Sequence, residues 1–229
     1  MKKTVLTFII SLMVCLQAGA WTDVRIDFGT AYTDPSGNWN TTTLAGNLTD
    51  YVDYYTGLNT GIGLTPSGFS STTIDSWSGA TIDWVDAAAA EDAAWIGASG
   101  ATLTINGLEV GQEYKIELVS ALYLDLERLP TFTIDGAIAD ISHNDNTNET
   151  YLTNWDMNEA YKNSDWLIWN GIVSSDGTLT LDIDLTHSPS QTGYISAMHI
   201  TTVPEPASAL MLTFAGLMIG GYRRFFSRD

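Results

Sequence analysis

Residues 178–185 read TLTLDIDL, and this stretch decides the fold class. Leucine and isoleucine occupy every second position from Leu179 to Leu185, and threonine or aspartate fills the positions between them. A period of two places apolar side chains on one face of a β-strand and polar side chains on the other. The stretch therefore predicts a strand with one face in a core and one face in water.

Other short segments show the same alternation and are separated by typical turn pairs. The segments are 23–28, 81–84, 102–105, 114–118, 132–134 and 194–200. The turn pairs are Asn106-Gly107, Val110-Gly111, Asp135-Gly136, Asp176-Gly177 and Thr192-Gly193. Together they predict an all-β domain, an antiparallel β-sandwich of jelly-roll or Greek-key type.

Within residues 21–202, only 86–94 have a helical composition, because they contain a run of alanines. We expect one or two turns of surface helix there. The long polar stretches 30–60 and 142–165 have weak periodicity and are expected to be loops. Since binding residues are frequently carried on loops, a ligand site is expected in these stretches if the protein has one.

The N-terminus has the features of a secretory signal peptide, residues 1–20. Two lysines precede an apolar run, and positions 18–20 supply the small residues that a signal peptidase requires. A lipoprotein signal is the alternative because Cys15 follows an apolar run, although Val14 is branched where such signals have a small residue. Cys15 is the only cysteine, so a chain that begins at Trp21 has no disulfide and no thiolate chemistry.

The C-terminal segment, residues 203–229, carries a proline motif, an apolar run and a basic cluster in that order. The uncharged run 207–222 predicts a transmembrane helix, with the arginines after it on the cytoplasmic side. At about 1.5 Å per residue the run spans roughly 24 Å, which is short of the ~30 Å hydrocarbon core. Spanning therefore requires local thinning or snorkelling of flanking residues. A buried C-terminal helix of the globular domain is the alternative.

This order of features resembles the PEP-CTERM sorting segment of Gram-negative bacteria that make exopolysaccharide. The residues that match are Pro204, Glu205, Pro206, Arg223 and Arg224, with the run 207–222 between them. The resemblance implies export, transient residence in the inner membrane, processing by an exosortase-type enzyme, and a final place at the cell surface or in the extracellular matrix. It implies an address and not an activity.

The region between these two signals, residues 21–202, is long enough for one domain with a sizeable core. It contains four of the nine basic residues and all but two of the 27 acidic residues. Such an acidic surface repels nucleic acid and anionic lipid, so neither is expected as a partner. All eight tryptophans also lie in this region, which favours a folded core over disorder.

Two sets of phrases in this region resemble secreted bacterial β-sandwiches of the galactose-binding-like or malectin-like type. The first set is IDFG at 26–29 with NWN at 38–40, and the second is LTINGL at 103–108 with YKI at 114–116. The resemblance implies carbohydrate binding, with extracellular polysaccharide as the candidate ligand. It does not identify the glycan, because one fold hosts many functions.

Aromatic side chains near amides and carboxylates bind sugars, because an aromatic ring stacks on the apolar face of a pyranose. The sequence offers two such groups: Trp39 with Asn38, Asn40, Tyr54 and Tyr55, and Trp155 with Asp156, Asn158, Tyr161, Trp166 and Trp169. The alternative is that Trp166, Ile168 and Trp84 face the core, since tryptophan is highly buried on average.

An oxygen-rich run at 144–149 has the ligand chemistry that calcium prefers. The candidate ligands are Asp145, Asn146, Asn148 and Glu149. The run lacks the glycine and the distal glutamate of an EF-hand loop, so a solvated polar loop is the alternative. No other cofactor is expected.

The sequence contains no Gly-x-Ser-x-Gly elbow, phosphate loop or dinucleotide fingerprint. His143, His187 and His199 are too scattered to suggest a metal site, and His199 is expected to be a packed or edge residue of a strand. The sequence therefore favours a non-catalytic structural or carbohydrate-binding component associated with exopolysaccharide. The alternatives are an exported glycan-active hydrolase, which needs two carboxylates with separated pKa values, and a scaffold or adhesin without a small ligand.

Overall fold

The computed structural model describes residues 21–29, 38–44, 48–74, 84–85, 92–97, 99–120, 131–138, 140–142, 166–186 and 193–203. Within these ranges the protein contains strands, turns and irregular segments, with no helix. The strands belong to one compact unit, Thr22–Thr202, and form three sheets. The all-β prediction is therefore confirmed.

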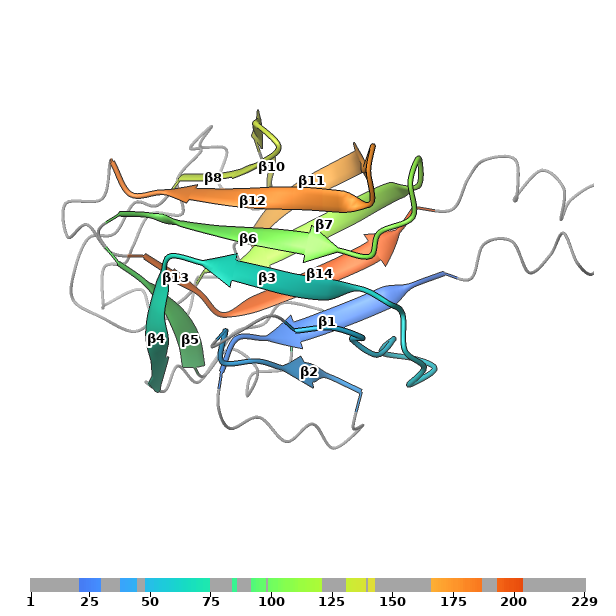
Figure 1. Cartoon of the computed structure of the whole chain (residues 1–229), viewed down its shortest axis with the longest axis horizontal. Coiled ribbons are helices and arrows are strands. Elements are labelled where there is room, and N and C mark those ends of the chain that lie inside the picture. Colours follow the sequence, from blue (N-terminus) through green and yellow to red (C-terminus); the bar gives the residue numbers. More distant parts are fainter. Residues whose placement is uncertain are drawn as a thin grey trace, which may run out of the picture. The chain divides into compact units, whose positions relative to one another are not determined.

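The largest sheet has six strands in the spatial order β10-β11-β7-β14-β1-β2 (Figure 1). Their bounds are β1 (Asp23–Asp27), β2 (Asn40–Thr41), β7 (Glu113–Val119), β10 (Asp140–Ser142), β11 (Trp166–Val173) and β14 (Ala197–Thr202). Neighbouring strands are antiparallel except β1 and β2, which are parallel. The first and last strands of the compact unit, β1 and β14, are therefore paired inside one sheet.

A second sheet has five strands in the order β3-β6-β12-β8-β9, and a third has three in the order β13-β5-β4. The five strands are β3 (Gly63–Ser67), β6 (Ala101–Asn106), β8 (Thr131–Ile134), β9 (Ala137–Ile138) and β12 (Thr178–Asp184). The three strands are β4 (Phe69–Ile74), β5 (Asp92–Ile96) and β13 (Gly193–Ile195). All the pairs in both sheets are antiparallel.

The hydrophobic core combines side chains of the six-stranded and five-stranded sheets. Ile26 and Leu118 contribute from the first sheet, Ile105 and Leu181 contribute from the second, and all four are fully buried. Burying a side chain of this size stabilises the fold by about 1.5–3 kcal/mol. Antiparallel sheets around one apolar core are consistent with a β-sandwich.

Strand β12 contains most of the stretch 178–185. Leu181 pairs with Leu103 of β6 on one side and with Ile134 of β8 on the other, and all three side chains are fully buried. Asp182, the next residue, turns to the opposite face and is exposed. The alternation in the sequence therefore corresponds to the two faces of the strand, as predicted.

Two predicted turns show why glycine is needed in them. Asp135 and Gly136 have φ angles of 46° and 80° and join β8 to β9 as a two-residue hairpin, in which both φ angles are positive. Gly107 has a φ of 76°, and a Cβ there would lie 2.0 Å from the carbonyl oxygen of Gly61. The turn predicted at Thr192-Gly193 is wrong for Gly193, which begins β13.

The helix expected at 86–94 is wrong for its last three residues, which belong to β5. Strand β5 pairs with β4 on one side and with β13 on the other. The helix propensity of alanine is a weak preference, and hydrogen bonding to two neighbouring strands overrides it. Residues 86–91 lie outside the described ranges. Trp84, expected in a strand, lies in a turn.

The stretch 30–60, expected to be loop, also contains sheet structure. Strand β2 lies within it, and isolated bridges join Leu48 to Leu64 and Val52 to Asn59. Of the second stretch, 142–165, only its first residue lies in a described element, the end of β10. Residues 143–165 lie outside the described ranges.

Candidate functional site

The outer face of the six-stranded sheet carries a row of charged side chains. Arg25 of β1, His199 of β14 and Glu117 of β7 are direct cross-strand neighbours. Asp23 and Lys115 lie two residues along the same strands and on the same face. We call Asp23, Arg25, Lys115, Glu117 and His199 the charged row.

His199 lies between the two carboxylates of the row. Its Nδ1 is 2.8 Å from Oε2 of Glu117, and its Nε2 is 3.1 Å from Oδ1 of Asp23, an ion-pair contact with poor hydrogen-bond alignment. An ionised carboxylate has no proton to donate, so both ring nitrogens suit these positions best when both are protonated. The geometry therefore favours the imidazolium form of His199.

The pKa shifts of the three groups agree with this geometry. Burial lowers the pKa of His199, but the carboxylates of Asp23 and Glu117 outweigh burial and raise it above its ordinary value of 6.5. Burial raises the pKa of Asp23 and of Glu117. The hydrogen bonds and charges of His199 and of a second basic residue at each carboxylate outweigh burial and lower both values. All three shifts favour the charged forms.

Two basic residues complete the pairing. Nζ of Lys115 lies 2.8 Å from Oε1 of Glu117, and Nε of Arg25 lies 3.1 Å from Oδ1 of Asp23. The guanidinium carbon of Arg25 also lies 3.7 Å from the centroid of the Tyr54 ring, a cation–π contact. Each buried carboxylate thus has two cationic partners, which is how buried charge is tolerated in proteins.

Trp84 packs against the charged row. Its ring stacks on the imidazole of His199 with centroids 5.1 Å apart, and its carbonyl oxygen accepts a hydrogen bond from Arg25. The side chains of Asp23, Glu117 and His199 are only 5%, 3% and 9% exposed. These three groups are therefore shielded from solvent.

Two further polar side chains hold the backbone of β1. Asp53 accepts a hydrogen bond from the N–H of Asp23 through Oδ2. The amide of Asn40 donates to the carbonyl oxygens of Arg25 and Val52 and accepts from the N–H of Val52. Strand β1, which supplies Asp23 and Arg25, is thus held on the side that faces away from β14.

The arrangement suits a structural role better than acid–base chemistry. A general acid or base must exchange a proton with a reacting group within hydrogen-bond reach. Both nitrogens of His199 face internal carboxylates, and Asp23 and Glu117 already pair with basic residues of the protein. The charged row therefore ties β1, β14 and β7 together across the sheet.

Trp166, predicted to bind sugar, lies half-buried on β11. Its Nε1 donates a hydrogen bond of 2.9 Å to Oε1 of Glu117, so its polar atom is used within the protein. The alternative that Trp166 and Ile168 face the core is wrong, because Leu167 and Trp169 occupy that side. Trp169 is 2% exposed and donates to a backbone oxygen, which removes it from the candidate sugar platform.

Part of the other aromatic group is assembled around Tyr54. Asn38 donates to the carbonyl oxygen of Tyr54, whose ring meets that of Tyr55 edge to face, with centroids 5.2 Å apart. Tyr55 is 71% exposed, and Trp39 is half-buried. Asn40 bonds to the backbone through both amide atoms and is therefore a structural residue rather than a ligand group.

The remaining predicted site residues lie outside the described ranges. They are the sugar candidates Trp155, Asp156 and Tyr161, the calcium candidates Asp145, Asn146, Asn148 and Glu149, and the sorting residues Pro204, Glu205, Pro206, Arg223 and Arg224. The expected signal peptide 1–20 and the run 207–222 also lie outside them.

In the part of the chain that the structure describes, no group of three histidine, cysteine, aspartate or glutamate side chains is arranged to hold a metal ion. The same residues include no helix that combines the length and apolar character needed to cross a membrane.

The charged row could not be identified from the sequence. The expectation that His199 is a packed strand residue is confirmed, but Glu117, its partner, is 82 positions away in the chain. The local sequence carries no signal for it, because Asp23 and Glu117 occupy the polar positions of ordinary alternating strands, as solvated charges would.

No known protein family matches this sequence, and no curated protein matches it either. Among solved structures, the chain is similar to the catalytic domain of a GH87 alpha-1,3-glucanase in complex with tetrasaccharides, with 10% identity and a TM-score of 0.32. The match covers 62% of this chain and 27% of that one, so it spans about a quarter of the solved chain. A likeness at this TM-score carries no argument about function.

Proposed function

We propose that this chain is an exported protein of a Gram-negative bacterium, sorted to the cell surface or extracellular matrix by its C-terminal segment. Residues 1–20 are a signal peptide, 21–202 form the β-sandwich domain, and 203–229 form the PEP-CTERM segment. Its helix 207–222 holds the protein in the inner membrane until an exosortase-type enzyme processes it. The domain is a non-catalytic structural or carbohydrate-binding component associated with exopolysaccharide.

The positions of the two ends of the folded unit carry this proposal. The N–H of Thr202 donates to the carbonyl oxygen of Thr22 at 3.1 Å, and the N–H of Thr22 donates to Oγ1 of Thr202 at 2.9 Å. The unit thus begins just after the expected cleavage site and ends just before Pro204. Such a unit keeps its strands when both terminal segments are removed, as an exported and processed protein requires.

Two further observations support the proposed architecture and role. Strands distant in sequence are neighbours, such as β1 with β14 and β6 with β12, which supports a jelly-roll or Greek-key connection. Asp23, Glu117 and His199 of the charged row are shielded from solvent and paired with one another, which supports a non-catalytic domain.

The sorting motif is tested by replacing Pro204, Glu205 and Pro206 with alanine in the producing bacterium. We expect the variant to remain in the membrane fraction at its unprocessed mass, while the native chain reaches the surface in a shorter form. A matched triple alanine variant at Thr65, Thr104 and Thr180, on the outer face of the five-stranded sheet, should behave as the native chain. Native processing of the motif variant would contradict the sorting proposal.

Carbohydrate binding is tested with a glycan array, with and without calcium. Trp155→Ala and Trp39→Ala should reduce binding if these rings stack on sugar. Trp166→Phe should leave binding unchanged if its indole N–H serves only Glu117. If no glycan binds while deletion of the gene alters the cell surface, the structural role is favoured over the carbohydrate-binding role.

A further inference from the structure

Three loops meet at the end of the sandwich where the folded unit begins and ends. A Cβ on Gly107 would collide with Gly61, so the loop 107–112 lies against the loop 53–62. The N–H of Leu108 donates to the carbonyl oxygen of Gly177, which joins the loop 107–112 to the loop 174–177. We call these three loops, with the Thr22–Thr202 pair, the tail-proximal end.

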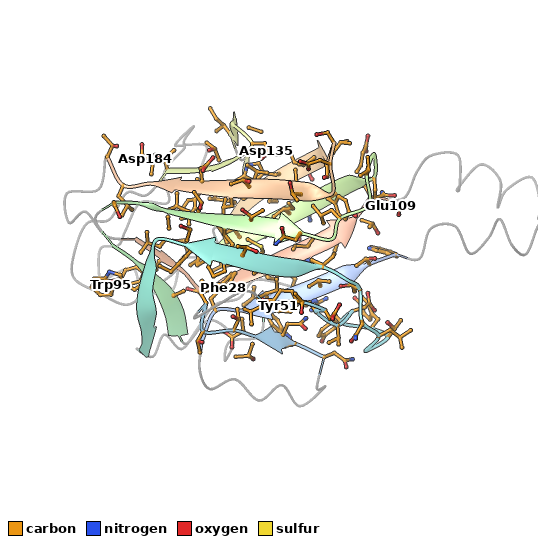
Figure 2. The ribbon with its side chains drawn as sticks, viewed as in Figure 1. Phe28, Tyr51, Trp95, Glu109, Asp135 and Asp184 are labelled. Atoms are coloured by element: carbon orange, nitrogen blue, oxygen red, sulfur yellow. The ribbon has the colours of Figure 1, made fainter. Side chains whose placement is uncertain are left out.

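Strand directions place the same loops together. Strand β1 starts and β14 finishes at this end, at the right of Figure 1, where the loops between β6 and β7 and between β11 and β12 also lie. Glu109, labelled in Figure 2, marks this end, and Asp184 marks the opposite end of β12. The loops 53–62, 107–112 and 174–177 therefore form one surface.

Exposed apolar side chains concentrate on this surface. Within the described residues, the large hydrophobic side chains that are exposed on the compact unit are Tyr55 (71%), Leu58 (69%), Val110 (62%), Val173 (47%) and Ile138 (64%). Tyr55 and Leu58 lie on the loop 53–62 and Val110 lies on the loop 107–112. Val173 ends β11, just before the loop 174–177, and pairs with Glu113, the first residue of β7. Ile138 of β9 pairs with Thr133, which pairs with Asp182 toward the far end of β12, so it lies away from these loops. Clustered exposed apolar residues indicate a contact surface.

The chain that follows Thr202 identifies the partner of this surface. Only Val203 and the Pro-Glu-Pro motif separate the end of β14 from the apolar run 207–222. Four residues span at most about 14 Å, so a run inserted in a bilayer keeps the tail-proximal end near the lipid headgroups. A tyrosine beside exposed aliphatic side chains favours the boundary between lipid headgroups and acyl chains, because its ring is apolar and its hydroxyl is polar.

We infer that Tyr55, Leu58, Val110 and Val173 form a membrane-contacting surface that lies on the lipid interface while the C-terminal run is inserted. This inference rests on the proposed membrane helix. Exposed Glu109, Glu113 and Asp176 lie at the same end, and they would be repelled by anionic headgroups. The surface therefore fits zwitterionic lipid, and contact with the membrane orients the sandwich on its anchor.

Single-cysteine labelling tests the contact, because residues 21–229 contain no cysteine. The chain 21–229 is reconstituted in phosphatidylcholine vesicles with an environment-sensitive fluorophore at Val110→Cys or Leu58→Cys. Ile138→Cys is the matched control, since it is equally exposed but lies elsewhere. Ser208→Cys reports insertion of the C-terminal run.

We expect blue-shifted emission and quenching by lipid-borne quenchers at positions 58, 110 and 208, with aqueous emission at position 138. If the label at 208 is in lipid but those at 58 and 110 emit as the label at 138 does, the contact surface is refuted while the membrane helix stands. If the label at 208 is also in water, the proposed membrane helix fails, and the inference that rests on it fails with it.

Discussion

In both large sheets, polar and apolar residues alternate along the strands, but the outward-facing side chains of the two sheets differ in solvent exposure. On the five-stranded sheet, Thr104 and Thr180 are direct neighbours, half-exposed and uncharged. On the six-stranded sheet, Asp23, Glu117 and His199 occupy the equivalent outward positions and are almost fully buried. A polar outward position is therefore not by itself evidence of solvent exposure.

Charge pairing accounts for the difference. A threonine hydroxyl can remain hydrated at little cost, and threonine is favoured in strands, so the five-stranded sheet needs no cover on that face. A carboxylate can be shielded from water only when cations and hydrogen bonds replace the lost hydration. Glu117 meets this condition through His199, Lys115 and Trp166.

Removing one carboxylate of the charged row should have the largest effect on stability. Glu117→Ala removes the acceptor of Lys115 and of the Trp166 indole N–H and leaves His199 with Asp23 alone, and we expect a loss of about 3–5 kcal/mol in the free energy of unfolding. Thr104→Ala, at a central position of the other outer face, should cost less than about 1 kcal/mol. Urea unfolding measures both, and equal losses would show that the two faces do not differ energetically.

The charged row should also set the pH dependence of stability. The pKa of His199 is raised, so its contribution is complete below about pH 6.5 and is lost as the pH rises through the folded-state value. The pKa values of Asp23 and Glu117 are lowered, so their contributions are present above about pH 4.5 and are lost as the pH falls through the folded-state values. We expect maximal thermal stability between these limits.

His199→Gln provides the control for this profile. Thermal melting followed across the pH range should show that the variant is less stable at pH 5.5 but lacks the loss of stability on the alkaline side. A parallel alkaline loss in the native protein and the variant would assign it to other groups.

Trp166→Phe should have an intermediate effect. The change keeps a ring on β11 but removes the N–H that donates to Glu117, and a hydrogen bond to a charged group contributes about 1.5–3 kcal/mol. Because the indole is half-exposed, we expect a loss near the lower end of that range. The loss should shrink in a Glu117→Gln background, and an unchanged loss there would mean that the indole acts through packing alone.

Thr180→Val should have the smallest effect. It is nearly isosteric, lies on the outer face of β12, and favours a strand as strongly as threonine does, so we expect a change within about 0.5 kcal/mol. A loss above about 2 kcal/mol in urea unfolding would show that the Thr180 hydroxyl makes a buried hydrogen bond and that this face is not simply solvated.

The sequence predicted the strands whose two faces differ in polarity. The alternation at 178–185 gave β12 and its orientation, because leucine and isoleucine face the core and aspartate faces water. The same pattern in β1 predicted the strand but not its surroundings, since Asp23 and Asp27 are buried as well. Periodicity records polarity, and it does not distinguish a solvated charge from a paired one.

Other features depended on contacts that local patterns do not contain. The alanines at 93 and 94 have high helix propensity, yet they form β5 because two strands flank them. Trp166 and Trp169 are the same residue type and lie three positions apart. The register of β11 against β7 places only Trp169 in the core. The contacts of His199 with Asp23 and Glu117 exist because β14 lies between β1 and β7, a pairing that no local sequence pattern contains.

The protonation state of His199 tests the central claim, that the charged row is structural and not an acid–base site. Nitrogen NMR of the imidazole, followed across the pH range beside free histidine, distinguishes the imidazolium from the neutral tautomers. We predict that His199 keeps both nitrogens protonated to a higher pH than free histidine does, because the two carboxylates raise its pKa. A His199 that loses its second proton at the same pH as free histidine, or below it, would contradict the account and leave the imidazole available for acid–base chemistry.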